Sequence, residues 1–329
     1  LLLDHAGRKA RRGYVTFGKA YAMLLCCGES LIDMLSRETG AGEAAFAPYS
    51  GGAVLNTAIA AARLGQKTAM LTGLSRDLFG QILEGHLASN HVDTSLCLLS
   101  DRPTTLAFVT LKDGHATYAF YDENTAGRMI SPVDLPASLE GITALFFGGI
   151  SLAVEPCADT YETLCLREAA RLPVMIDPNI RPSFIADAAR YRARLARMLA
   201  VADIIKLSDE DLAWLSNNSS EVEAVGDLLT AGAKLVLITK GADGVTAYSA
   251  DGQLIHPVIP ATVVDTVGAG DTFNAGILTG LAEAEYLSKA ALAAPLPQDV
   301  LKAALDLGVR AAAVTVARAG ANPPLRAEI

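Results

Sequence analysis

The 329-residue sequence is poor in the residues that build disulfide frameworks and metal sites. It has five cysteines, an odd number, and no C-x-x-C pair. Its five histidines lie far apart and show no metal-ligand spacing such as H-E-x-x-H. We therefore expect free thiols in a reducing compartment, the cytoplasm, and neither a disulfide framework nor a zinc site.

A positive charge balance and long apolar runs are lacking as well. The sequence has 27 Lys and Arg against 36 Asp and Glu, a formal net charge of −9, whereas a nucleic-acid partner would require a basic face. No apolar run reaches the roughly 20 residues of a membrane-spanning helix. The G-x-x-x-x-G-K-[ST] loop and the H-R-D and D-F-G motifs of protein kinases are also missing. We expect a protein that binds neither nucleic acid nor membrane.

From Met23 onward, the sequence alternates short apolar runs with alanine-rich helical patterns. Strands are predicted at Leu24–Gly28, Thr68–Thr72, Ala144–Phe147, Val174–Asp177, Ile204–Lys206 and Leu235–Thr239. Helices are predicted at Val54–Leu64, Phe79–Asn90, Ala158–Arg171, Ala188–Ala200, Ser220–Ala231, Ala269–Glu283 and Gln298–Ala317. Such alternation indicates an α/β fold with a mostly parallel central sheet covered by helices on both faces.

Three segments depart from this alternation. Residues 104–121 alternate apolar and polar side chains around Asp113-Gly114, which predicts a β-hairpin. Residues 34–50 are irregular, and we expect both segments to form a small β-sheet lid on a single domain of residues 23–329. An exposed edge of this lid would allow a homodimer. Residues 1–22 carry five basic residues and one acid; we interpret them as a disordered extension or expression remnant, the alternative being a basic arm that docks a partner.

The strongest motif is DTVGAGDTF, residues 265–273. Gly268, Ala269 and Gly270 precede an amphipathic helix, so their backbone N–H groups can converge on an anion such as a transferring phosphoryl group. Asp271 follows in the first helical turn, where a carboxylate can accept the proton of a hydroxyl group. The alternative is an aspartate that only caps a helix after a glycine-rich turn.

DTVGAGDTF, together with SGGAVLNTAIAAARLG at residues 50–65, resembles the ribokinase-like (PfkB-type) carbohydrate kinases. The segments GESLIDML, GGAVLNTA, DRPTTLAFV, YAFYDENTAG and DPNIRP are most similar to bacterial fructokinases. The resemblance covers Met23 to about Gly320 and implies a ribokinase-like fold with Asp271 as catalytic base and an anion hole at Gly268–Gly270. It also implies an ATP-dependent sugar kinase that phosphorylates the primary hydroxyl of D-fructose. The alternatives are a 2-keto-3-deoxygluconate kinase and a non-catalytic sugar- or nucleotide-binding regulator.

The resemblance further implies a set of sugar-binding residues. They are Asp33, Gly51, Gly52, Asn56 and Arg181. Paired glycines let a ligand approach the backbone, and an asparagine both donates and accepts hydrogen bonds toward a polyol. Arg181 follows a strand in the DPNIRP turn, where its guanidinium would lie near the sugar or the transferring phosphate. The alternatives are a loop aspartate, a turn before a helix, an asparagine on a helix face and a solvated arginine.

The segment KLSDED, residues 206–211, is implied to serve the nucleotide and its metal. Lys206 and Ser208 are nucleotide-binding candidates, and Asp211 would organise a hydrated Mg²⁺ through water. The family usually has Asn and Glu at these last two positions, so the adjacent Glu210 is an alternative metal-organising residue. Ser208 followed by acids also predicts a helix N-cap.

Two further segments complete the implied site. The loop after the strand at Leu235–Thr239 would bind the nucleotide, with Lys240 reaching a phosphate or the base, unless it is an ordinary hairpin turn. Its candidate nucleotide-binding residues are Thr239, Lys240, Gly241 and Gly244. Asp265 matches a ligand of a monovalent cation, together with backbone carbonyls of Ala317–Gly320. ATP, Mg²⁺ and K⁺ are therefore the cofactors that the resemblance implies.

Overall fold

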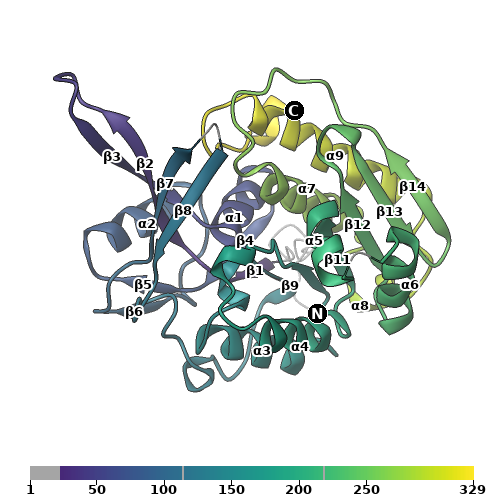
Figure 1. Ribbon diagram of the computed structural model, residues 1–329. Coiled ribbons are helices and arrows are strands. Elements are labelled where there is room, and N and C mark those ends of the chain that lie inside the picture. The colour runs from purple at the N-terminus through teal and green to yellow at the C-terminus, as the bar shows by residue number, and fades with distance from the viewer. Residues whose placement is uncertain (1–22, 113–114, 218) are drawn as a thin grey trace, which may run out of the picture.

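The computed structural model describes residues 23–112, 115–217 and 219–329 (Figure 1). The expectation for residues 1–22 lies outside this range. The central sheet contains β1 (Met23–Cys27), β4 (Lys67–Leu71), β9 (Ile142–Gly148), β10 (Val174–Asp177), β11 (Ile204–Ser208), β12 (Leu235–Thr239), β13 (Val245–Ser249) and β14 (Gly252–His256). Its order is β14-β13-β12-β11-β10-β9-β1-β4, and every pairing from β4 to β12 is parallel. Only β13 and β14 pair antiparallel, which confirms the predicted mostly parallel sheet.

Helices cover both faces of this sheet, as predicted (Figure 1). One face carries α1 (Ala53–Arg63), α2 (Leu78–Ser89), α7 (Ala269–Glu283), α8 (Lys289–Leu292) and α9 (Gln298–Val316). The other carries α3 (Cys157–Glu168), α4 (Ala188–Leu199), α5 (Asp209–Leu215) and α6 (Glu221–Ala231). In β1, Leu24 and Cys26 pack into the first layer and Leu25 and Cys27 into the second. Because alternate side chains enter opposite cores, strands buried on both faces are continuously apolar.

A second sheet projects from the main body in Figure 1 and is called the lid sheet here. It contains β2 (Leu31–Glu38), β3 (Ala44–Gly51), β7 (Leu106–Lys112) and β8 (His115–Tyr121), in the order β3-β2-β7-β8. The hairpin expected at residues 104–121 is confirmed as β7 and β8, and its Asp113-Gly114 turn lies outside the described residues. Residues 34–50 belong to the lid sheet, as expected, but the prediction that they are irregular is wrong. They belong to an antiparallel hairpin in which Pro48 lies on an outer strand, where a missing N–H donor is tolerated.

Short elements connect these layers. They are the two-stranded pair β5 (Gly73–Ser75) and β6 (Leu98–Ser100) and the 3₁₀ turns η1 (Pro132–Asp134), η2 (Ile150–Leu152), η3 (Pro182–Phe184), η4 (Gly241–Asp243) and η5 (Arg326–Glu328). Among the described residues, no helix combines the length and apolar character needed to cross a membrane.

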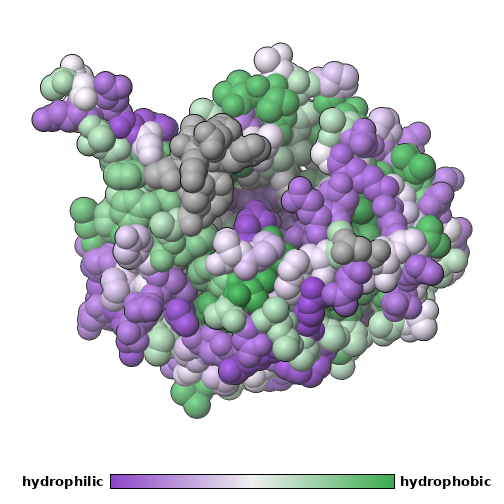
Figure 2. Space-filling model, viewed as in Figure 1, coloured by the Kyte–Doolittle hydropathy of each residue, from purple (hydrophilic) through white to green (hydrophobic). Residues whose placement is uncertain are grey.

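The carboxyl ends of the parallel strands converge beside the lid sheet. Asp177 ends β10, Ser208 ends β11 and Thr239 ends β12, while Glu29 follows β1. On this face the molecule is hollowed between the lid sheet and the C-terminal helices, and hydrophilic side chains lie in the hollow (Figure 2). Open α/β sheets bind ligands outside the carboxyl ends of their strands, so the topology places the candidate site here.

Candidate active site

Asp271 lies in the first turn of α7 and is buried, with 7% of its surface exposed. The Nδ2 of Asn56, on the neighbouring helix α1, donates a hydrogen bond of 2.9 Å to the Oδ2 of Asp271. Burial raises the pKa of Asp271 to about 7, although the Asn56 hydrogen bond opposes this shift. The structure therefore brings these two predicted residues together, with Asn56 orienting a carboxylate that can exchange protons near neutral pH.

The loop before Asp271 presents backbone amides at the start of α7. Gly268 has φ +79°, and a Cβ there would lie 2.8 Å from the Cβ of Ala321, so a side chain would be both strained and crowded. The N–H of Ala269 donates to the carbonyl of Thr266 at 3.3 Å. Among the described residues, nothing accepts a hydrogen bond from the N–H of Gly270 or of Asp271. These two amides, at a helix N-terminus, are available to an anion.

Asp33 lies on β2 of the lid sheet and is half-buried. Burial raises its pKa to about 6, and no donor in the described part of the chain contacts its carboxylate. A Cβ on Gly51 would lie 2.1 Å from the Oδ2 of Asp33. Gly52, at φ +105°, begins the turn into α1. The first glycine makes room for Asp33 and the second supplies the turn, which together leave a carboxylate free to bind hydroxyl groups.

Glu29 is a buried residue of this site that sequence reasoning did not assign. Its Oε1 accepts a hydrogen bond of 3.0 Å from the N–H of Ala53, and its Oε2 accepts one of 3.3 Å from the N–H of Ser151. Burial raises the pKa of Glu29 despite these bonds. The carboxylate ties the start of α1 to the segment after β9. Its position directly after the first strand, in GESLIDML, is the signal that could have identified it.

Asp177 and Asn274 were missed as well. The register pairs Ile176 with Ile205, which places Asp177 beside Lys206 on the neighbouring strand. The Lys206 Nζ lies 3.0 Å from the Asp177 Oδ2, and the Asn274 Nδ2 donates to the same oxygen at 2.7 Å. Asp177 and Lys206 lie toward the carboxyl ends of the adjacent parallel strands β10 and β11, so their proximity could be found once the strand order was known.

Ser208 and Asp211 form the N-terminal cap of α5. The Ser208 hydroxyl accepts a hydrogen bond from the Asp211 N–H at 3.0 Å, and the Asp211 Oδ2 accepts one from the Ser208 N–H at 3.1 Å. The Asp211 Oδ1 accepts a further bond of 2.8 Å from the N–H of Ile180. Burial and the nearby Asp177 raise the pKa of Asp211, against the effect of Lys206. The capping alternative is thus present, and Glu210 is exposed beside it.

No group of three or more His, Cys, Asp or Glu side chains able to hold a metal ion occurs in the described ranges. The described side chains therefore do not form a dedicated metal cage.

Two predicted cationic residues, Arg181 and Lys240, make their contacts away from Asp271. The guanidinium of Arg181 is exposed and donates to the carbonyl of Ile180 at 3.1 Å, within its own turn. The Nζ of Lys240 lies 2.8 Å from Glu221, whose carboxylate also accepts a bond of 2.6 Å from the Tyr248 hydroxyl. The structure thus assigns both charges to local contacts.

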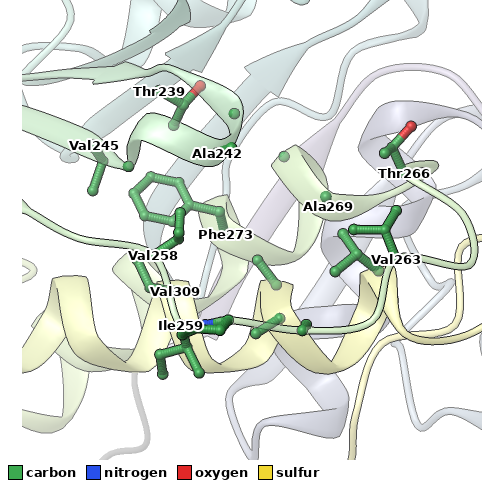
Figure 3. Close-up of a pocket in the computed structure, with 18 residues that line it drawn as sticks. Thr239, Ala242, Val245, Val258, Ile259, Val263, Thr266, Ala269, Phe273 and Val309 are labelled. Atoms are coloured by element: carbon green, nitrogen blue, oxygen red, sulfur yellow. The ribbon is translucent and has the colours of Figure 1, made fainter.

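A cavity of 540 Å³ lies between the η4 loop, the N-terminus of α7 and α9 (Figure 3). Predicted nucleotide residues Thr239, Gly241 and Gly244 line it, and so do Ala269 and Gly270 of the anion-hole loop. The other lining residues are mostly apolar and include Val258, Ile259, Phe273 and Val309. An apolar cavity that opens onto free amides matches a nucleotide, with the base in the cavity and the phosphates at the helix.

Asp265 links two segments behind this loop. Its Oδ1 accepts a hydrogen bond of 3.0 Å from the N–H of Val267, and its Oδ2 accepts one of 2.9 Å from the N–H of Gly320. The predicted neighbours, Asp265 and Ala317–Gly320, therefore do meet, through this bond.

The sequence profile described as "pfkB family carbohydrate kinase" matches residues 21–328. A fructokinase of Rhizobium leguminosarum bv. trifolii is 53% identical over 267 residues, which are 81% of this chain and 82% of that protein. The chain belongs to the pfkB family of carbohydrate kinases. A fructokinase of Klebsiella pneumoniae is 36% identical over 78% of this chain and 83% of its own length.

The fold comparison agrees with the sequence comparison. The crystal structure of a fructokinase with bound ATP from Xylella fastidiosa superimposes with a TM-score of 0.85 at 29% identity, covering 92% of this kinase and 95% of that chain. The ribokinase-like α/β fold and the carbohydrate kinase activity expected from the sequence are thus confirmed.

Proposed function

We propose that this kinase transfers the γ-phosphate of ATP to the primary hydroxyl of D-fructose and yields fructose 6-phosphate. The observation that carries the proposal is the placement of Asp271: a buried carboxylate with a pKa of about 7, oriented by Asn56, at the helix N-terminus that offers free amides. The fructokinases among its relatives support the choice of sugar.

The reaction follows from this geometry. Asp271 accepts the proton of the sugar hydroxyl while the hydroxyl oxygen forms a bond to the γ-phosphorus, and ADP leaves with the electrons of the broken P–O bond. The free N–H groups of Gly270 and Asp271 hold the charge that develops on the phosphoryl oxygens, and Gly268 and Ala269 form the turn that presents them. Asn56 keeps the carboxylate aimed at the hydroxyl.

Fructose is favoured over 2-keto-3-deoxygluconate by the charges around the hollow. Asp33, Glu29 and Asp271 all contribute carboxyl groups there, and burial raises the pKa of each. Such surroundings disfavour further negative charge. Arg181, the residue that would pair with a substrate carboxylate, is instead exposed and bound to backbone carbonyls. In this proposal Asp33, Gly51, Gly52 and Asn56 line the sugar side, and Arg181 lies at its rim.

The nucleotide side is proposed from the lining of the 540 Å³ cavity. Thr239, Gly241 and Gly244 would contact the nucleotide, with Lys240 and Ser208 at its border. Asp211 would orient waters of a Mg²⁺ bound with ATP, and such an ion neutralises phosphate charge when present. Asp265 and the 317–320 segment would hold a K⁺.

Three wider expectations accompany this proposal. The described cysteines are free, which supports a reducing compartment, the cytoplasm. The lid sheet leaves Phe46, Tyr49 and Tyr121 at 43%, 46% and 63% exposure, which supports a homodimer testable by sedimentation velocity. The lid sheet would close over the sugar and exclude water.

The test is a coupled ADP-release assay of the intact chain with MgATP and D-fructose, 2-keto-3-deoxygluconate, ribose or adenosine. We expect turnover with fructose and a product phosphorylated at carbon 6. Turnover on the keto acid alone would replace the substrate and keep the mechanism. Tight ATP binding with no turnover on any of the four would favour a binding regulator.

A further inference from the structure

Lys206 is buried against the loop that starts α7. It lies on β11, where Ile205 and Leu207 face the α3–α6 layer, so Lys206 faces the opposite layer that contains α7. Its side chain is 6% exposed. A Cβ on Gly270 would lie 3.2 Å from the Lys206 Nζ. The ammonium group therefore lies beside the backbone of Gly270, whose N–H has no acceptor among the described residues.

The surroundings of Lys206 hold its charge in place. Its Nζ contacts the Oδ2 of Asp177 at 3.0 Å. That carboxylate is fixed in turn by the Asn274 Nδ2 and by the N–H of Asn179, at 2.7 and 3.1 Å. Burial by itself would lower the pKa of Lys206, but the carboxylates of Asp177, Asp211 and Asp271 raise it above its usual value. Lys206 is thus a cation throughout the neutral range.

The other candidate cationic side chains, Arg181 and Lys240, already have partners away from the N-terminus of α7. Arg181 donates to backbone carbonyls of its own turn, and Lys240 pairs with Glu221 on α6. Within the described part of the chain, Lys206 is the buried cation that lies against the N-terminus of α7. A phosphoryl group in transfer carries charge on its equatorial oxygens, which a fixed cation stabilises without reorganisation.

We propose that Lys206 is a catalytic residue whose ammonium group binds the transferring phosphoryl group at the Gly270 amide. This inference rests on the proposed function, because it assigns a role in the same transfer. The hydroxyl proton goes to Asp271, the new O–P bond forms as the bond to ADP breaks, and Lys206 stays protonated while it donates hydrogen bonds to the phosphoryl oxygens. A Cβ on Gly270 would lie 3.2 Å from this ammonium group, a tight contact that the glycine avoids.

The first test compares Lys206→Met with wild type. We expect kcat to fall by about 10²–10³, the usual loss for one transition-state donor, while the Kd of ADP changes less than threefold, because ADP lacks the group that Lys206 binds. The matched control is Lys289→Met. Lys289 also pairs with a buried carboxylate, that of Asp203, at 2.7 Å, but this pair lies at the opposite end of the sheet. The kcat of Lys289→Met should therefore stay within twofold of wild type.

A double variant separates catalysis from charge balance. Lys206→Met leaves Asp177 without its cation, whereas Asp177→Asn together with Lys206→Met removes both buried charges. We expect the double variant to recover the melting temperature and to keep the low kcat. Recovery of kcat to within tenfold of wild type would overturn the proposal, since Lys206 would then only neutralise Asp177. Where the single variant does not fold, the double variant carries the same test.

This proposal and the proposed function fail in different ways. A wild-type protein that phosphorylates another sugar leaves the Lys206 test intact with that sugar. A wild-type protein that turns over fructose, with Lys206→Met equally fast, overturns only the role of Lys206. A weakened ADP affinity in Lys206→Met with unchanged kcat would place Lys206 in nucleotide binding instead.

Discussion

Three carboxylates, those of Asp271, Asp33 and Glu29, share a raised pKa because the fold buries them. Their partners differ. Asp271 accepts a bond from Asn56, Glu29 accepts bonds from two backbone amides, and Asp33 has no donor among the described residues. The three carboxylates thus have different roles: Asp271 exchanges a proton, Glu29 positions two loops, and Asp33 is open to a ligand.

For Asp271→Asn, we expect kcat/KM to fall by about 10²–10⁴, the usual contribution of a general base. The melting temperature at pH 8 should stay equal or rise. The folded pKa of about 7 lies above the ordinary value of 3.8 for an aspartate, so the stability that Asp271 contributes at low pH is lost as pH rises through 7. Calorimetry beside the kinetic assay checks both effects, and a large loss of stability would show that the carboxylate is structural.

The sequence indicated the residues that lie within contiguous motifs, and it missed those whose role depends on residues that are close only in the folded structure. Asp271, Asn56 and Asp33 could be predicted because their motifs are contiguous in the sequence. Asp177 and Asn274 become meaningful only through the strand register and the helix packed beside it. Conversely, no contiguous pattern shows that Arg181 and Lys240 have local partners, which are set by a turn and by α6.

Among the secondary-structure elements, α7 depends on an N-cap that only glycine fits. We expect Gly268→Ala to lower the free energy of unfolding by about 1–3 kcal/mol, because alanine at φ +79° is strained. It should also lower kcat, since the amides that follow would move. Urea denaturation and steady-state kinetics measure the two effects.

Gly226→Ala is the matched control for that variant. Gly226 lies within α6, and a Cβ there meets nothing within 4 Å, so alanine should stabilise the protein by about 0.5–1 kcal/mol and leave kcat unchanged. Equal behaviour of the two variants would contradict the special role of Gly268.

The central strands and long helices were predictable because apolar periodicity is strong in buried elements. The predicted range Val174–Asp177 coincides with β10 and Ala269–Glu283 with α7. Residues 34–50 were assigned to the lid, but the pairing of β2 with β3 was not predicted, since both strands are only partly buried and one contains Pro48. Such strands are fixed by pairing within the lid sheet, which the sequence pattern of one segment does not encode.

For the whole molecule, the lid sheet meets the main body at an aromatic contact. The rings of Phe120 on β8 and Phe184 on η3 lie 4.8 Å apart, edge to face. We expect Phe184→Ala to raise the KM of fructose several-fold and to increase ATP hydrolysis without sugar phosphate, because the lid sheet closes less often. ADP and sugar phosphate are measured in parallel.

The control for the lid contact is Phe46→Ala. Phe46 packs against Phe108 and, by strand alternation, lies on the face of the lid sheet opposite Phe120. This variant should keep the ratio of sugar phosphate to ADP at one. If both variants increase ATP hydrolysis without sugar phosphate to the same extent, the contact between Phe120 and Phe184 does not hold the lid sheet closed.

The role of Asp271 as the catalytic base is tested most directly by the pH dependence of kcat/KM for fructose between pH 5.5 and 8.5. Asp271 must be ionised to accept the hydroxyl proton, and its pKa is about 7, so kcat/KM should rise tenfold per pH unit on the acid side and level off above 7. A rate that is constant over this range, or that falls as pH rises through 7, would contradict Asp271 as the base.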